Sequence, residues 1–247
     1  MSRFYVRPEA VQGDRVAFDE AETHHIVRVL RLGPGALVRA LDGRGGELTI
    51  RVDDLTGRRA SGVVVDRAAR RAESPLELTL AQGLPKGDKL DAIVRMATEL
   101  GVARVVPLVC RRTVARLEPG RGAARLARWE RIAREAAKQC GRAAIPEVSA
   151  PMPLSQWLRR PREPGLLLCL WEAEPTLLDA VLPDERPARV VLVVGPEGGL
   201  TPEEVDDLRA AGARVAGLGP RILRTETAGP VGLALLQSRY GDLGRAP

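Results

Sequence analysis

The sequence predicts an α/β protein with two parts, a small amino-terminal β-barrel and a carboxyl-terminal α/β domain built on a mostly parallel sheet. In the first quarter of the chain, short segments that are rich in Val or alternate in polarity are separated by turn residues, which is typical of a small barrel. Farther along, strands alternate with amphipathic helices, an order that favours a parallel sheet. A charged, Ala/Arg-rich segment, residues 66–74, looks like a linker. We therefore predict domains of residues 1–72 and 73–247.

The composition is that of a globular protein with an excess of positive charge. Of the 247 residues, 45% are hydrophobic and 28% are charged, which is enough for a sizeable core. The net charge is +6, which favours a polyanionic partner, and nearly all of the positive charge is arginine. Arginine suits phosphate binding, although a composition bias explains its abundance equally well. No apolar run approaches the roughly 20 residues of a membrane span, and the chain start lacks a signal-peptide core, so we expect a cytoplasmic protein without membrane contact. The 3 cysteines and 2 adjacent histidines have no metal-like spacing, so we expect neither a disulfide nor a metal site.

The first domain is expected to contain five strands and one helix. The segment 42–46 is rich in glycine and predicts a hairpin turn between two of the strands. In the helix, residues 21–32, the spacing directs Ile26, Val29 and Leu30 inward. The outer face is either an RNA-backbone contact or a solvated surface, and it carries His24, Arg28 and Arg31. The expected strands are 3–6, 15–18, 36–41, 47–52 and 61–65.

The second domain is expected to alternate strands, apolar along their whole length, with helices that carry an apolar stripe. One helix start is especially clear, because Thr201 can cap it, Pro202 suits its first position and Glu204 completes a capping box. The expected strands are 76–82, 105–109, 165–171 and 190–194, and the other expected helices are 86–100, 122–140, 154–158 and 227–240.

Two of these helices have faces that suggest partners. The helix 122–140 has a basic side, which either holds phosphates or is neutralised by glutamates at i+4 spacing. The last helix is apolar nearly all round, so it is covered either by the domain core or, the more attractive explanation, by a second copy in a homodimer. The basic residues in question are Arg131, Arg134 and Lys138, with Arg142 just beyond the helix.

Two loops are candidate sites. The strand Val190–Val194 ends at Gly195-Pro-Glu-Gly-Gly199, which is either a tight turn or a loop that lets a flat ligand approach the backbone. The second loop, Leu218–Ala228, contains arginines, a glutamate and two threonines within a few residues, directly before the last helix. Either Thr225 or Thr227 can cap the start of this helix. Concentrated charge beside an apolar helix usually marks a site.

Several chemistries are excluded by the motifs that the sequence lacks. It contains no phosphate-binding loop, no dinucleotide fingerprint, no zinc-protease motif and no serine-hydrolase elbow, and the second domain has no histidine to act as a general base. Methyl transfer from S-adenosylmethionine fits these restrictions, because the protein mainly has to align an activated donor with its acceptor. Cys140 as a nucleophile is far less attractive than a buried structural role, since no neighbour would lower its pKa.

The longest motifs resemble one family. The sequence is similar to the bacterial 16S ribosomal RNA methyltransferases that modify N3 of uracil 1498, members of the SPOUT class. The resemblance covers nearly the whole chain and rests on Gly195–Leu200, Leu218–Ala228, Glu99–Val102, Gln139–Arg142 with Pro146, Arg3–Tyr5, His25 with Val29–Arg31, and Tyr240–Gly244. It departs from expectation at Gly229-Pro230, where ordinary helix formers are expected, and at Trp171, which has no assigned role.

The resemblance implies a fold, a cofactor and partners. The implied fold is a PUA-like RNA-binding barrel followed by a SPOUT domain. The end of the chain forms a trefoil knot in this domain, and two copies associate through the knot as a homodimer. The substrate is 16S rRNA of the 30S subunit, and RNA contacts are assigned to Arg3, His24, Arg28, Arg31, Lys86 and Arg142. S-adenosylmethionine is expected to bind Leu170, Gly195, Pro196, Glu197, Gly198, Gly199, Leu218, Gly219, Ile222, Leu223, Thr225 and Thr227.

Two residues of the second loop are assigned to catalysis. Arg224 is expected to bind a carbonyl oxygen of uracil and favour the anionic base, while Glu226 orients Arg224 or takes the proton. The alternative is that the two residues only pair and brace the fold. Two rival functions are a knotted methyltransferase for ribose 2′-OH groups or transfer RNA, and a non-catalytic ribosome-assembly protein.

Overall fold

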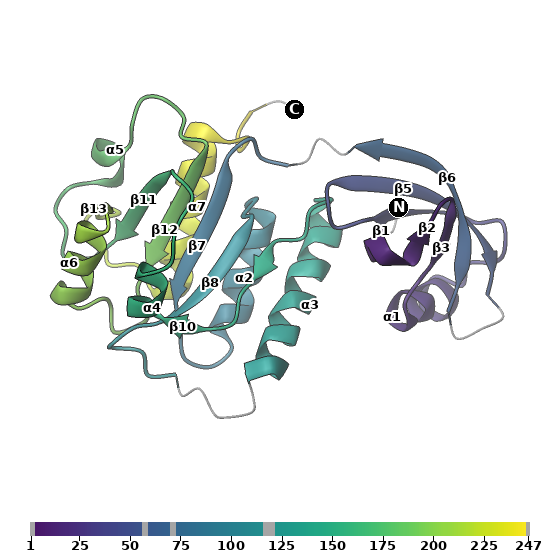
Figure 1. The fold of residues 1–247 in the computed structure, drawn as a ribbon, viewed down its shortest axis with the longest axis horizontal. Coiled ribbons are helices and arrows are strands. Elements are labelled where there is room, and N and C mark those ends of the chain that lie inside the picture. Colours follow the sequence, from purple (N-terminus) through teal and green to yellow (C-terminus); the bar gives the residue numbers. More distant parts are fainter. Residues whose placement is uncertain (1–2, 56–58, 70–72, 116–121, 246–247) are drawn as a thin grey trace. The chain divides into compact units, whose positions relative to one another are not determined.

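The computed structural model describes residues 3–55, 59–69, 73–115 and 122–245 (Figure 1). The chain divides into two compact units. The first consists of residues 1–73 together with 134–145, and the second of residues 74–133 together with 146–247. A segment from the middle of the chain therefore completes the first unit.

The first unit is built on a six-stranded mixed sheet with the order β1-β4-β5-β6-β3-β2. β1 and β4 are parallel and the other pairs are antiparallel. β1 and β2 are the edge strands of this order, so the described part of the sheet is an open half-barrel where we expected a small barrel. Its core is formed by Phe4, Phe18, Ile26 and Ile50, with the Phe rings edge to face. The strands are β1 (Arg3–Tyr5), β2 (Val11–Gln12), β3 (Arg15–Ala17), β4 (Leu37–Leu41), β5 (Gly46–Asp54) and β6 (Ser61–Ala69), with a 3-10 turn, η1 (Pro8–Ala10), before β2.

Two expectations for this unit need correction. β6 continues to Ala69, so the first part of the expected linker is strand, and residues 70–72 lie outside the described residues. The expected single helix is a short α-helix, α1 (Glu20–His24), which continues as a π-helical turn, η2 (His25–Val29). The wider turn, closed by Leu30 N–H donating to His25 O, changes the periodicity. Val29 consequently is 59% exposed rather than inward, whereas Ile26 is fully buried.

The second unit contains a seven-stranded sheet in which every pairing is parallel. The order is β10-β8-β7-β12-β11-β13, and β9 pairs with β8. In register, Gln82 of β7 pairs with Val194 of β12, Val194 with Leu170 of β11, and Leu170 with Ala216 of β13. Four strands therefore end at one edge, which gathers the loops that follow them. The strands are β7 (Glu77–Gly83), β8 (Arg104–Val109), β9 (Glu147–Val148), β10 (Met152–Pro153), β11 (Leu166–Leu170), β12 (Arg189–Val194) and β13 (Arg214–Ala216).

Helices cover both faces of this sheet, because its strands are apolar on both sides. On one face, α4 and α6 pack with strand residues such as Ala81 and Val193 in a single apolar cluster. On the other face, α7 lies against β7, β12 and α2 (Figure 1). The helices are α2 (Lys89–Glu99), α3 (Gly122–Cys140), α4 (Leu154–Leu158), α5 (Leu178–Val181), α6 (Pro202–Ala210) and α7 (Thr225–Tyr240).

The start of α6 confirms the local prediction. The Thr201 side chain accepts a hydrogen bond from Glu204 N–H, and the Glu204 carboxylate accepts one from Thr201 N–H. This reciprocal capping box places the helix directly after the glycine loop.

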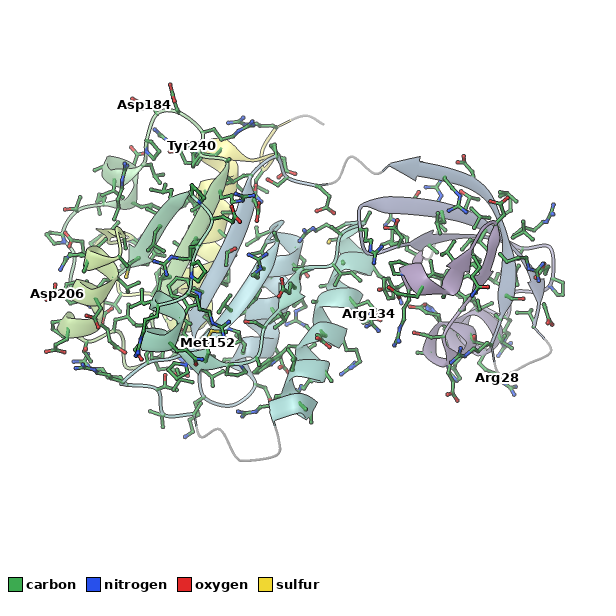
Figure 2. All side chains as sticks on the ribbon, in the orientation of Figure 1. Arg28, Arg134, Met152, Asp184, Asp206 and Tyr240 are labelled. Atoms are coloured by element: carbon green, nitrogen blue, oxygen red, sulfur yellow. The ribbon has the colours of Figure 1, made fainter. Side chains whose placement is uncertain are left out.

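The last helix differs from expectation at its start. α7 begins at Thr225, and neither Thr225 nor Thr227 is its N-cap residue, because Arg224 occupies that position without a side-chain hydrogen bond. Pro230 lies inside the helix and is buried. At the far end, Tyr240 (Figure 2) donates a hydrogen bond to Pro183 O. Of the helices that the structure describes, none is long and apolar enough to cross a membrane.

Candidate functional site

A cavity of about 820 Å³ opens at the edge of the second sheet where β11, β12 and β13 end. Its walls come from the loop after β11, both predicted loops and the first turn of α7. Among the residues predicted to bind a cofactor, Gly198 and Thr227 do not line it. Those that do are Leu170, Gly195, Pro196, Glu197, Gly199, Leu218, Gly219, Ile222, Leu223 and Thr225, together with Arg224 and Glu226.

The first loop contains a glycine, Gly199, in a backbone conformation that other residues rarely adopt. Gly199 has a φ of +70°, and a Cβ atom there would lie 2.3 Å from Glu172 Oε1. Gly199 N–H donates to Pro196 O, so the segment is a tight turn as well as a wall of the cavity. The preceding strand also contributes, because a Cβ on Gly83 would lie 2.3 Å from Pro196 N. The loop backbone therefore rests directly on the end of β7.

A buried hydrogen-bond network joins the two loops. Gln82 is fully buried at the end of β7, and its Nε2 atom donates to Thr225 Oγ1 at 2.9 Å. Thr225 Oγ1 in turn donates to Gly195 O at 2.6 Å. Since buried polar groups are costly unless paired, this network fixes the start of α7 against the first loop.

A lysine at the start of α2 connects the same two loops by charge. Lys89 Nζ lies 3.1 Å from Glu197 Oε1 and 3.2 Å from Glu226 Oε2. Hydrogen bonding to these two carboxylates raises the pKa of Lys89. The pKa of Glu226 is lowered by a hydrogen bond from its own backbone N–H and by the nearby cations Lys89 and Arg224. Partial burial acts against ionisation of Glu197, but backbone hydrogen bonds and Lys89 outweigh it and lower its pKa as well. Both carboxylates are therefore ionised at neutral pH.

Arg224 is an exposed cation that lines the cavity, as is Arg221. Its side chain is 83% exposed, and its Nη1 atom lies 4.0 Å from Glu226 Oε1, at the limit of an ion pair. Ile222 in the same loop is 81% exposed. The cavity thus combines apolar side chains, ionised carboxylates and the exposed guanidinium groups of Arg221 and Arg224. This set suits a ligand with apolar and cationic parts beside an acceptor with polar oxygens.

The residues predicted to contact RNA have different surroundings. In the first unit, His24, Arg28 and Arg31 are exposed, and Arg28 is labelled in Figure 2. Arg3 is only 27% exposed and lies 3.8 Å from Glu47. Arg142 is buried and pairs with Glu73 at 2.9 Å, so its guanidinium stabilises the first unit instead of facing solvent. Lys86 is exposed in the second unit, and its backbone N–H donates to the Glu197 carboxylate.

Several residues of the site were missed by the sequence reasoning. Gln82, Gly83 and Lys89 precede the first loop by more than a hundred positions, so no local pattern connects them with it. Only Lys89 could have attracted notice in the sequence. A cation at the start of a helix opposes the helix dipole, which suggests that carboxylates from elsewhere in the chain compensate it. Trp171, left without a role, lines the cavity beside Leu170 and packs against the core of the second unit.

The cysteines are not part of this site. Burial raises the pKa of Cys110 and of Cys169 to about 12. Cys140 is half-buried in α3, and its thiol donates to Ala137 O. In the described residues, no three or more His, Cys, Asp or Glu side chains are grouped as metal ligands would be.

Comparison with known proteins gives consistent matches along the chain. Residues 72–237 match a family model described as an RNA methyltransferase domain, and residues 18–65 match an RNA methyltransferase PUA domain. The Ribosomal RNA small subunit methyltransferase E of Synechocystis is 37% identical over 96% of this chain and 77% of its own. That of Bacillus subtilis is 31% identical over 92% of this chain and 93% of its own.

Solved structures agree with these sequence matches. The Ribosomal RNA small subunit methyltransferase E of Neisseria gonorrhoeae, bound to S-adenosylmethionine, superposes with a TM-score of 0.86 at 33% identity, covering 98% of this chain and 99% of that one. A protein from Legionella pneumophila, solved with S-adenosylmethionine as its bound cofactor, superposes with a TM-score of 0.89 at 32% identity and the same coverage.

Proposed function

The chain belongs to the RNA methyltransferase family, and from that premise we propose that it transfers a methyl group from S-adenosylmethionine to N3 of uracil 1498 in 16S rRNA of the small ribosomal subunit. The observation that supports this most directly is the cavity at the sheet edge, which joins both glycine-containing loops to an extended arginine. The relatives named above are small-subunit rRNA methyltransferases, and two similar structures hold S-adenosylmethionine.

The residues of the cavity fit this cofactor. Gly199 and Gly195 leave room for close approach to the backbone, and Leu170, Leu218 and Leu223 provide apolar contact for an adenine ring. When bound, S-adenosylmethionine supplies a methyl group activated by a positively charged sulfur. The ionised carboxylates that line the cavity suit a ligand with this positive charge.

Arg224 is proposed to activate the acceptor. Uracil N3 carries a proton that must leave before the nitrogen can attack the methyl group, and the negative charge then spreads onto the carbonyl oxygens. An 83% exposed guanidinium can donate to one of these oxygens and stabilise the anion. Glu226 has a lowered pKa and is therefore a weak base, so we assign it to orienting Arg224 and assign the proton to solvent.

RNA contacts are proposed for each of the two predicted domains separately. We propose that residues 1–72 bind RNA and residues 73–247 bind the cofactor and catalyse, and that this takes place in the cytoplasm, where small-subunit rRNA is found. His24, Arg28 and Arg31 are exposed in the first unit and Lys86 in the second, which supports a phosphate-binding role for each. Arg3 remains a weaker candidate because it is mostly covered, and buried Arg142 is no longer assigned to RNA.

A homodimer and a trefoil knot also remain proposals. Leu235 on α7 is 47% exposed and Ile222 is 81% exposed, which supports an apolar surface near the chain end that a second copy can cover. Thr225, at the start of α7, is hydrogen-bonded to Gln82 and Gly195, which come earlier in the chain. These contacts are compatible with a chain end that is threaded through a knot. Light scattering of the purified protein tests the dimer, since a monomeric mass would contradict it.

The proposed function is tested by incubating small subunits with labelled S-adenosylmethionine and analysing the nucleosides by mass spectrometry. We expect 3-methyluridine from the natural protein and a loss of about a hundredfold or more in kcat for Arg224→Ala. Arg95→Ala, which removes an exposed arginine from α2, is the matched control and should retain activity. A ribose-methylated product or a labelled transfer RNA would identify the first rival function. Failure to bind S-adenosylmethionine by calorimetry would identify the non-catalytic one.

A further inference from the structure

Lys89 is the point at which three separate segments of the site meet. It is the first residue of α2, and its ammonium contacts Glu197 of the first loop and Glu226 of the second. Glu197 is in addition held by Lys86 N–H at 3.0 Å, so the segment after β7 binds this carboxylate with backbone and side chain together. A single cation therefore connects α2 with both loops that line the cavity.

The position of Lys89 is not favourable for the helix itself. Cations are destabilising near a helix amino terminus, where the backbone dipole is positive, and the preceding residue, Asp88, makes no capping hydrogen bond from its side chain. The two carboxylates offset this cost. Without the ammonium, Glu197 and Glu226 would both present negative charge to the same space, since each lies within 3.2 Å of Nζ.

Glu226 depends on Lys89 more than on Arg224. Its Oε2 atom is buried, and the Lys89 ammonium, 3.2 Å away, compensates its charge. Arg224 approaches only the other oxygen, at 4.0 Å. The closer cation thus fixes the carboxylate, and the more distant one stays extended at the mouth of the cavity.

We infer that Lys89 is a positioning residue for methyl transfer. It holds the Glu226 carboxylate in place, and Glu226 in turn keeps Arg224 where it can meet the acceptor base. This inference rests on the proposed function, because it assigns Lys89 a part in the same reaction. Small displacements of such groups are costly, since an error of about 1 Å in a catalytic arrangement can reduce the rate about a hundredfold.

The test is a double-mutant cycle between Lys89→Met and Glu226→Gln, measured as kcat on small subunits at saturating cofactor. Lys89→Met should lower kcat by about tenfold or more in the natural background, with a smaller effect on KM. In the Glu226→Gln background, the same substitution should have little further effect on kcat, because the Lys89–Glu226 ion pair that positions Arg224 is already absent. Lys89→Arg, which retains the cation, should recover most of the activity, and Arg95→Met on the same helix is the control for loss of one positive charge.

The outcomes separate this inference from the proposed function. If the natural protein transfers no methyl group, the proposed function is wrong and the inference fails with it. If the natural protein is active and Lys89→Met lowers only the melting temperature, or lowers kcat equally in both backgrounds, the proposed function stands and the inference is overturned. Lys89→Gln carries the same expectation and replaces Lys89→Met should that variant not fold.

Discussion

Replacing Gly83 with alanine should displace the first loop of the cavity. The added Cβ would lie 2.3 Å from Pro196 N and 2.6 Å from Gly195 C, and both of these are backbone atoms that cannot rotate away. Ordinary contact requires the loop to move by roughly 1 Å. Gly83 is at the end of β7 and its φ is not in the left-handed region, so the clash alone determines the cost. Overpacking of this kind costs about 1–3 kcal/mol.

The same displacement should affect both cofactor binding and folding. If the displaced loop weakens cofactor binding by only 1.4 kcal/mol, about a tenfold rise in Kd follows, and calorimetry with S-adenosylmethionine measures it directly. Thermal unfolding should show a decrease of several degrees in Tm. Gly122→Ala is the matched control, because a Cβ on Gly122 meets no atom of the described residues within 4 Å and its φ is not positive. A Gly83→Ala protein with the natural Kd and Tm would refute the argument that the loop backbone rests on this strand end.

Three further predictions concern buried or charged groups. Gln82→Leu leaves Thr225 and its neighbours without a buried donor, so denaturant unfolding should show a loss of about 1–3 kcal/mol. The pKa of Glu226 lies below its ordinary value of 4.5, so its ion pair with Lys89 should persist above pH 4.5 and be lost as the pH falls below that value. A change in kcat near neutral pH that disappears in Glu226→Gln would contradict this expectation. Cys110 and Cys169, with pKa values of about 12, should resist thiol reagents until the protein unfolds, whereas half-buried Cys140 should react first, as mass spectrometry of the labelled protein can show.

Local signals in the sequence were sufficient where a structure depends on neighbouring residues. The bounds of α3 and α4 match the predicted helices, and the capping box at Thr201 is present as expected. These features depend on periodicity and on caps within a few residues, which a single sequence displays. The helix that became α1 and η2 shows the limit of this reasoning, because a π-helical turn alters the period and moved Val29 to the surface.

Long-range charge pairs were also beyond the sequence. Arg142 had the spacing of a phosphate ligand, yet it is buried against Glu73, a residue 69 positions away. A formal charge in a sequence does not reveal whether folding supplies a partner, because that depends on which segments the core brings together. Exposure, in contrast to charge, is a property of the tertiary structure.

The sequence by itself determined the two kinds of domain, the strand that ends in the first glycine loop, the charged second loop and the family that these motifs resemble. Only the tertiary structure decided the strand order that places β7 beside β12, and with it the contacts of Gln82, Gly83 and Lys89 with loops far along the chain. The physical reason is that helices and caps arise from local interactions, whereas parallel strand pairing is selected by the burial of the whole sheet. The tertiary structure likewise brings a cation from α2 to the glutamate of the second loop.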